Sequence, residues 1–342
     1  MKRLLLTTLQ ITITVLLLWW IFRDPEKRAQ MLAAMHTADY LWLIPGLLCV
    51  GLAFLFQTAR WRILMGVQGI QMGWWRTLGV YFVGAFFNLF LLGSTGGDII
   101  KIYYAMRETA SKKSAALLSV LVDRMMGLIA MVALAVVLCS LRWDLILSNP
   151  KTAALMGTLG VILGASLGLI IFGFIVDRFH LAHKLPRWLP LHAKIVELSV
   201  AFSVYARSPR ILTMAFGLSI PAHLLNFLSF YFAARAFGVF PGLTGMVDIL
   251  AVLPIIMTIA AMPISLAGVG VREGLFQKVF SELFGTPDSV AVLISISGFL
   301  MVVAWGLVGG LVYLAYRPSG GLHLEEMEKE VEAVEESIEH EA

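Results

Sequence analysis

The chain has 342 residues, of which 59% are hydrophobic and only 14% are charged, and its mean hydropathy is +0.85. Soluble domains are typically about 45–50% apolar and about 25% charged, so this composition excludes a soluble globular protein and predicts an integral membrane protein. The only two cysteines lie in apolar runs, which excludes a disulfide framework, and no compact basic patch on a soluble module favours a nucleic-acid partner.

The net charge of +4 is distributed unevenly along the chain. From Arg317 onward two basic residues stand against nine glutamates, whereas the preceding 316 residues carry a net charge of +11. We therefore predict a transmembrane domain over residues 1–316 and an acidic cytoplasmic tail over residues 317–342. The basic domain favours membrane lipids with anionic headgroups as partners. The tail is interpreted either as a solubilising segment or as a docking site for a protein partner.

Eight apolar segments have about the length of 20 residues that a helix needs to cross the hydrocarbon core of a bilayer. In chain order they are residues 4–22, 41–59, 77–93, 115–139, 153–176, 211–232, 247–264 and 289–316. The first segment follows Met1-Lys2-Arg3, and no A-x-A cleavage site comes after it, so we interpret it as a retained signal anchor. The predicted fold is an all-α, polytopic transmembrane helical bundle in the inner (cytoplasmic) membrane.

Two topologies remain open for these segments. If all eight cross the membrane, ten Lys and Arg residues lie in inside loops and 15 in outside loops, against the positive-inside rule. If residues 77–93 and 247–264 enter and return on the same side, the inside loops hold 17 and the outside loops eight. The second version gives two inverted halves of three crossings, each with a re-entrant segment. Both versions place the N- and C-termini in the cytoplasm.

Asp123 and Arg124 lie inside the apolar segment 115–139. A charge at the centre of a membrane helix costs about 2.5–3.5 kcal/mol on insertion scales, so such residues normally face a partner or a watery cavity. Neighbours on a helix point about 100° apart, so we expect each of the two to have a partner on another segment. Such contacts could fix the packing of the helices, or bind a lipid phosphate or relay protons.

Two polar, glycine-rich breaks interrupt the apolar pattern, at Asn88–Asp98 and at Pro263–Glu273. Broken elements at membrane depth occur only where they are buried in protein or line a cavity. Aligning Gly97-Asp98 with Arg272-Glu273 suggests two copies of one element, as in transporters with inverted repeats. The alternative is a pair of ordinary glycine-rich turns with capping carboxylates.

Signatures of enzymes are missing from the chain. There is no G-x-x-x-x-G-K-[ST], no H-E-x-x-H and no Cys/His cluster with zinc spacing. Ser94 and His223 could form an intramembrane hydrolase pair, but Ser94 does not lie in a G-x-S-x-G elbow. The basic loop 177–210 is too short for a transferase domain. We therefore expect no enzymatic activity, no cofactor and no metal, and keep a membrane-embedded transferase as an alternative.

Both glycine-rich breaks carry a resemblance to a known family. The pattern Asn88…Gly96-Gly97-Asp98-Ile-Ile-Lys101 followed by Asp123-Arg124, and the pattern Pro263-Ile-Ser…Gly268-Val-Gly270-Val-Arg272-Glu273, resemble the lysylphosphatidylglycerol synthase transmembrane-region family of flippase-like proteins. The resemblance covers about residues 4–316. In the best-understood members this region is joined to a cytoplasmic aminoacyl-transferase domain and is thought to move the product lipid between leaflets. The resemblance therefore implies lipid translocation here, without the synthase activity.

We predict a translocase for a phospholipid or a polyprenyl-linked lipid, with an accessory subunit that docks through the acidic tail as a further alternative. Three cations are expected to meet the lipid phosphate and three carboxylates to hold those cations in place. The oligomeric state stays open. The predicted substrate-binding residues are Asn88, Gly96, Gly97, Asp98, Lys101, Asp123, Arg124, Pro263, Gly268, Gly270, Arg272 and Glu273, with Lys101, Arg124 and Arg272 as the cations and Asp98, Asp123 and Glu273 as the carboxylates.

Overall fold

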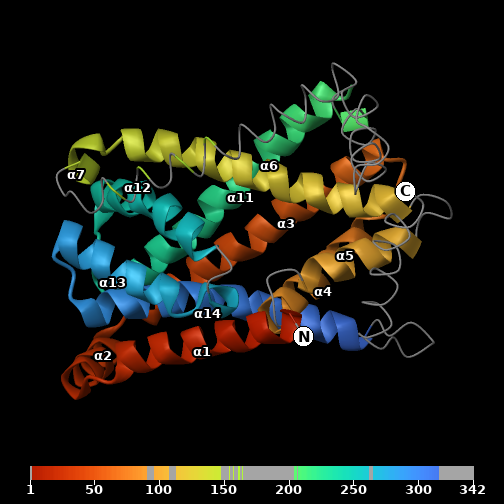
Figure 1. Ribbon diagram of the computed structural model, residues 1–342. Helices are drawn as coiled ribbons and strands as arrows, with labels where there is room; N and C mark the ends of the chain where they lie inside the picture. Colours follow the sequence, from red (N-terminus) through yellow and green to blue (C-terminus); the bar gives the residue numbers. More distant parts are fainter. Residues whose placement is uncertain are drawn as a thin grey trace.

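The structure, a computed structural model, is a bundle of helices without strands in the part of the chain that it describes (Figure 1). The described residues are 2–90, 96–107, 113–147, 154, 157, 161, 164, 204–205, 207–261 and 265–315. Among them, five helices are long and apolar enough to cross a membrane. This confirms the predicted all-α polytopic fold. The predicted segment 153–176, most of the loop 177–210 and the acidic tail lie outside the described residues.

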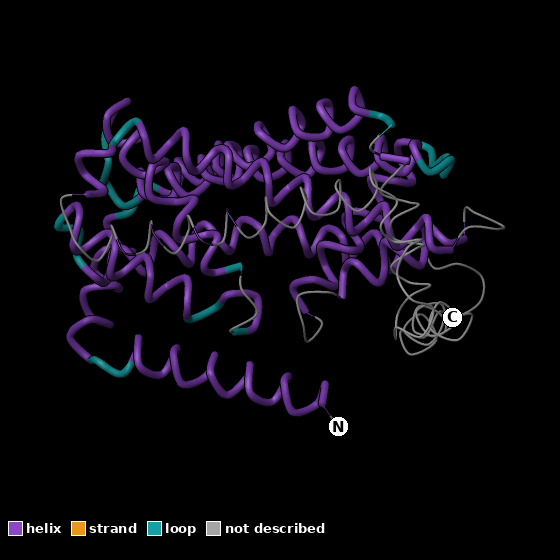
Figure 2. The backbone as a smooth tube through the Cα atoms, turned by 45° about the horizontal axis from the view of Figure 1, so that its top comes forward, coloured by secondary structure: helices purple, strands orange, loops and turns teal. Residues whose placement is uncertain are grey.

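The first two helices run along one face of the bundle and reach one of its ends. Helix α1 (Lys2–Phe22) is followed by α2 (Pro25–Thr37), whose first turn is capped by Asp24 through the Glu26 N–H at 3.0 Å. Leu9, Leu16 and Trp19 of α1 are more than half exposed, as suits contact with lipid. We call the end of the bundle where α2 lies the α2 end (Figures 1 and 2).

Helix α3 (Leu43–Val67), preceded by the short 3-10 helix η1 (Tyr40–Trp42), is longer than the predicted segment 41–59. The helix thus extends eight residues beyond the predicted segment and includes Arg60. The helix continues because its arginines find partners: Arg60 pairs with Asp123, and Arg62 Nε donates to the Met72 carbonyl at 3.2 Å. A charged residue ends a membrane segment only when nothing inside the protein satisfies it.

Helices α4 (Trp74–Phe90) and α5 (Gly96–Arg107) form what we call the first hairpin. They are antiparallel, because Tyr104 near the end of α5 lines the same small cavity as Trp75 near the start of α4. Both therefore open at the same end of the bundle, the α5 end (Figure 1). Sequence reasoning left these residues in the connection between the predicted segments 77–93 and 115–139. It missed α5 because 12 residues are too few to register as a membrane segment.

Helix α6 (Lys113–Ser140) leads back to the α2 end and to the short α7 (Trp143–Leu147). Helix α11 (Pro209–Ala236) then packs along α3 in the opposite direction. Trp42 at the start of α3 stacks on Phe232 near the end of α11, with 6.2 Å between ring centroids. The antiparallel pair of α3 and α11, which we call the central pair, has the most extensive helix–helix contact among the described residues.

Helices α12 (Gly242–Ala260) and α13 (Val271–Phe284) form the second hairpin, joined in part by the 3-10 helix η2 (Leu266–Gly268). Phe240, just before α12, packs on Phe284 at the end of α13, with 4.8 Å between centroids, so this hairpin opens at the α2 end. Its turn lies midway along the bundle, because the Leu266 N–H donates to Thr14 Oγ1 in the middle of α1 at 2.9 Å.

The helices after α7 repeat the packing of those before it, in inverted orientation. Helix α14 (Asp288–Ala315) packs against α3, α4 and α13 as α6 packs against α11, α12 and α5. The two hairpins enter from opposite ends of the bundle, as Figures 1 and 2 show. Each of the segments predicted at 77–93 and 247–264 thus returns to its own end, which favours the topology with re-entrant segments over eight crossings.

Close contact inside the first hairpin requires a glycine at position 97. The Gly97 N–H donates to Asn88 Oδ1 at 2.9 Å, and a Cβ on Gly97 would overlap the Gly84 carbonyl oxygen. We expect Gly97→Ala to destabilise the protein by about 1–3 kcal/mol, because neither backbone can yield. The measurement is thermal unfolding of the purified protein in detergent, followed by circular dichroism.

The matched control is Gly217→Ala in α11, where a Cβ meets no atom within 4 Å. Alanine in a helix interior is favoured over glycine by about 0.5–1 kcal/mol, so this variant should melt at or above the wild-type temperature. If both variants melt like the wild type, the close approach of α4 and α5 described above is wrong.

Candidate functional site

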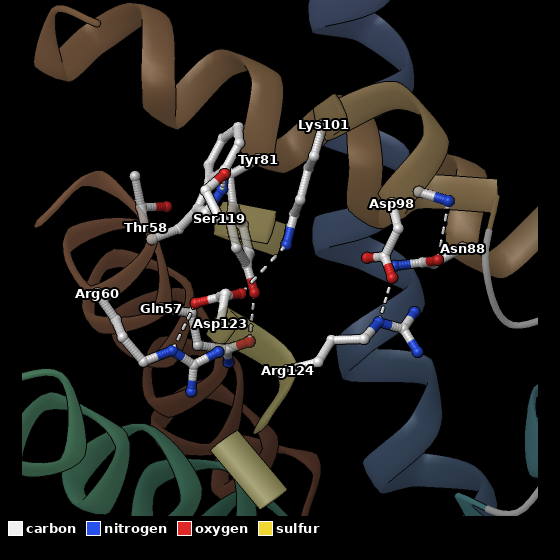
Figure 3. Close-up of polar contacts among 12 residues, drawn as sticks. Gln57, Thr58, Arg60, Tyr81, Asn88, Asp98, Lys101, Ser119, Asp123 and Arg124 are labelled. Carbon is white, nitrogen blue, oxygen red and sulfur yellow. Dashed lines mark hydrogen bonds and ion pairs between the residues drawn. The ribbon is translucent and has the colours of Figure 1, made fainter. Parts of the chain in front are cut away.

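Three charged side chains from three helices meet in the interior, and we call them the buried charge cluster: Arg60 of α3, Lys101 of α5 and Asp123 of α6. Arg60 Nε donates to Asp123 Oδ1 at 2.7 Å, and Lys101 Nζ lies 3.8 Å from Asp123 Oδ2 (Figure 3). Each of the three side chains is at most 7% exposed. The cluster thus links the first hairpin to the two helices that flank it.

Neighbouring helices complete the surroundings of the cluster. Arg60 Nη1 donates to Ser219 Oγ of α11 at 3.0 Å. Lys101 Nζ lies 3.9 Å from the centroid of the Tyr81 ring and 5.5 Å from that of Trp61. A cation over an aromatic face is stabilised by the quadrupole of the ring. The aromatic rings therefore provide part of the stabilisation that a second carboxylate would otherwise give.

The cluster contains two cations and one carboxylate. Burying an ion costs several kcal/mol unless a counter-ion and hydrogen bonds compensate for the lost water. Asp123 compensates Arg60 through a short charge-assisted hydrogen bond, but it reaches Lys101 only at a distance too long for one. The cluster therefore carries one excess positive charge when Lys101 is protonated.

A second ion pair lies beside the cluster, between Arg124 Nε of α6 and Asp98 Oδ2 of α5 (Figure 3). Asp98 is the third residue of α5, where the helix dipole favours a carboxylate. The side chain of Arg124 is 45% exposed and that of Asp98 is 13% exposed. Arg124 is therefore accessible from outside the protein while it remains paired.

The second hairpin has its own ion pair at the corresponding place, the start of α13. Arg272 Nη2 lies 2.7 Å from Glu273 Oε1, and Ser295 Oγ of α14 donates to the same oxygen at 2.9 Å. Arg272 also lies over the ring of Phe299, with Cζ 4.1 Å from the centroid. Both members of this pair are buried.

Glu273 also fixes the turn of the second hairpin. Its Oε2 accepts from the Gly270 N–H at 2.5 Å, which satisfies a donor at the start of α13. Gly270 has φ +86°, and a Cβ there would press on Leu17 of α1. Only glycine adopts this backbone conformation without strain. The glycine and the glutamate are thus both required by the local geometry.

The structure brings the predicted site residues together in two groups. The first group, at the first hairpin and α6, consists of Asn88, Gly96, Gly97, Asp98, Lys101, Asp123 and Arg124, and the second, at the turn of the second hairpin, of Gly268, Gly270, Arg272 and Glu273. Pro263 lies outside the described residues. The expectation that Asp123 and Arg124 each find a partner on another segment is confirmed. Of the three predicted cations, Arg124 is exposed, whereas Lys101 and Arg272 are buried in this conformation.

Sequence reasoning missed Arg60, Tyr81 and Ser295. Arg60 was assigned to a loop, although Gln57, Arg60 and Trp61 recur at the spacing of one helix face and could have indicated a polar contact inside the membrane. The Tyr81 ring lies against Lys101 Nζ of the cluster. Its hydroxyl donates to Gln57 Oε1 at 2.5 Å. No pattern in the sequence marks Ser295.

His223, Ser94 and a metal site were the other functional possibilities considered from the sequence. The His223 ring lies 2.9 Å from the Gly127 carbonyl oxygen through Nε2, which therefore donates, and it stacks beside Phe227. This is the geometry of a packing residue, and Ser94 lies outside the described residues. Within the described ranges, no three His, Cys, Asp or Glu side chains are grouped so that they could hold a metal ion.

The apolar helices and the two opposed hairpins with charged side chains at their inner ends define a multi-pass α-helical membrane protein. The chain belongs to the lysylphosphatidylglycerol synthase TM region family, which it matches over residues 7–309. This confirms the family predicted from the motifs. A stretch of 134 residues is 25% identical to the UPF0104 membrane protein PH1989 of Pyrococcus horikoshii, and it covers 39% of this chain and 38% of that protein.

Proposed function

We propose that this protein moves a lipid with a phosphate-containing headgroup, a phospholipid or a polyprenyl-linked lipid, between the leaflets of the cytoplasmic membrane. The observation that carries the proposal is the pair of opposed hairpins, α4–α5 and α12–α13, each with an ion pair at the start of its returning helix. Discontinuous helices at corresponding places in two inverted halves are typical of transporters that alternate access around a central site.

Electrostatics favours an anionic headgroup as the transported group. The returning helices α5 and α13 both begin inside the bundle, so the positive ends of their dipoles lie there. Arg124 adds a half-exposed guanidinium, whose planar fork matches the geometry of a phosphate. The buried charge cluster adds one excess positive charge behind it. We infer that the phosphate of the headgroup displaces the carboxylate of Asp98 and binds to Arg124.

Movement of the hairpins against the central pair of α3 and α11 would open the site to either leaflet in turn. The inverted repeat relates the α2 end to the α5 end. Movement of each hairpin would therefore open the site to one side of the membrane. We propose that the α5 end faces the cytoplasm, because the topology with re-entrant segments gives 17 Lys and Arg residues in inside loops and eight in outside loops, with both termini inside. We propose transport without a chemical reaction.

The test is leaflet exchange of labelled lipids in liposomes that contain the purified full chain. The panel holds phosphatidylglycerol, phosphatidylethanolamine, lysylphosphatidylglycerol, a polyprenyl phosphate and a glycosyl diacylglycerol, whose polar headgroup has no phosphate. We expect exchange of one or more phosphate lipids above the rate in protein-free vesicles, and none of the glycosyl diacylglycerol. Asp98→Ala, which removes the carboxylate that positions Arg124, should lose that exchange.

Four outcomes would count against the proposal. Exchange of no lipid by correctly folded protein would exclude a translocase of this kind, and a fully active Asp98→Ala would exclude the proposed site. A lipid product with an altered headgroup would support a membrane-embedded lipid or glycosyl transferase instead. A second protein that co-purifies with the full chain, and is lost when residues 317–342 are deleted, would support an accessory subunit.

A further inference from the structure

The ion pairs around α5 divide the protein into a moving part and a fixed part. Two of them, Lys101–Asp123 and Asp98–Arg124, join the first hairpin to α6. The third, Arg60–Asp123, joins α6 to α3, which belongs to the central helix pair. If the first hairpin moves, as the proposed function requires, the first two pairs separate and the third remains.

Separation has unequal consequences for the two cations of the buried charge cluster. Arg60 keeps its 2.7 Å hydrogen bond to Asp123 and its contact with Ser219 on α11. Lys101 loses the carboxylate with which it forms its ion pair, and that contact is already long at 3.8 Å. The charge of Asp123 is thus compensated by Arg60 without Lys101, and the ammonium keeps no carboxylate in direct contact, only the longer-range interaction with Asp98 on its own helix.

Lys101 is enclosed too closely for a lipid headgroup to replace the lost carboxylate in the conformation described. The residue is 5% exposed, and its side-chain carbons lie against Gly84 of α4, where a Cβ would come within 3.4 Å of Lys101 Cγ. Tyr81 and Trp61 cover Nζ from α4 and α3. The ionisable and charged groups around it are Arg60 on α3, Tyr81 on α4, Asp98 on α5, and Asp123 and Arg124 on α6.

An ammonium in this position can lose its charge by giving up one proton, which a guanidinium cannot do. We propose that Lys101 is a proton-carrying residue that couples the movement of the first hairpin to a proton gradient. The N–H bond breaks as the hairpin withdraws from α6, and the proton passes to water on the open side. The neutral amine takes one proton from water when the hairpin returns to Asp123. This inference rests on the proposed function, because it requires the hairpin to move.

Two substitutions at Lys101 separate the two charge states. Lys101→Arg keeps a permanent cation beside Asp123, and Lys101→Gln is permanently neutral. Lys278→Arg, at an exposed position of α13, is the matched control. The first measurement is exchange of the five panel lipids between pH 6 and pH 9 in proteoliposomes. A pH-sensitive dye inside the vesicles records proton flux in the same samples.

For the wild type and Lys278→Arg, we expect exchange to rise with pH, by at most about tenfold per pH unit, because the neutral fraction of an amine rises by that factor below its pKa. Lys101→Gln should exchange lipid at a rate that does not depend on pH. Lys101→Arg should remain slow throughout the range. Proton flux should accompany exchange in the wild type and be absent from both Lys101 variants.

A second measurement does not depend on lipid transport. Spin labels at Arg107 of α5 and Leu121 of α6, in a background without Cys49 and Cys139, report the separation of the hairpin from α6 in detergent. We expect longer distances at high pH in the wild type, longer distances at every pH in Lys101→Gln, and no change in Lys101→Arg. Absence of lipid exchange combined with these distance changes would overturn the proposed function but support the role of Lys101. Equal pH responses in the wild type and Lys101→Arg, in both measurements, would overturn the role of Lys101.

Discussion

Replacing Asp123 by alanine should destabilise the protein by about 3–5 kcal/mol, the usual cost of removing one partner from a buried ion pair. The carboxylate is 3% exposed and is the counter-ion of two buried cations, Arg60 and Lys101. Its removal leaves both charges without compensation inside the bundle. The measurement is the midpoint of unfolding of the purified protein in detergent, by heat or by added denaturing detergent.

The control for this variant is Asp144→Ala on α7. Asp144 also lies near an arginine, Arg142, at 3.8 Å, but its side chain is 80% exposed. Exposed ion pairs contribute about 0–1 kcal/mol, so the control should unfold almost like the wild type. Equal midpoints for Asp123→Ala and Asp144→Ala would contradict the compensating role of Asp123.

A triple variant tests whether the loss comes from uncompensated charge rather than from lost packing. Asp123→Leu combined with Arg60→Met and Lys101→Met replaces the cluster by apolar side chains of similar length. Replacing all members of a buried ion network in this way is often neutral or stabilising. We expect the triple variant to recover most of the stability that Asp123→Ala loses.

Replacing Arg124 by alanine should reduce lipid exchange by about 10- to 100-fold, because a hydrogen bond to a charged group contributes about 1.5–3 kcal/mol. The effect on stability should be small, since the side chain is 45% exposed and the helix dipole of α5 still favours the carboxylate of Asp98. Exchange in liposomes and thermal unfolding in detergent, measured on the same preparation, separate the two effects.

Two further variants sharpen this prediction. Arg124→Lys keeps the charge but loses the planar fork of donors, so its rate should lie between those of Arg124→Ala and the wild type. Arg28→Ala, at an exposed position of α2, removes a cation away from the proposed site and should leave exchange unchanged. Loss of exchange in Arg28→Ala as well would indicate a general electrostatic effect on lipid binding instead of a site at Arg124.

The membrane class, the approximate positions of the long helices and the two glycine-rich breaks could all be predicted from the sequence. Helix positions follow because the bilayer requires about 20 apolar residues per crossing, a local property of the chain. The breaks at Gly97 and Gly270 follow because close backbone contact and positive φ leave few residue types. Asp123 and Arg124 were recognised because charges are rare at membrane depth.

The sequence also determined that a charge inside the membrane needs a partner, but only the tertiary structure decided which one. Arg60 lies 63 residues before Asp123, and Ser295 lies 22 residues after Glu273, so the contacts depend on how distant helices pack. Packing likewise buries Lys101 and Arg272 and leaves Arg124 exposed. The short α5 and the return of both hairpins were not determined locally, because a half-membrane helix forms only where neighbouring helices satisfy its ends.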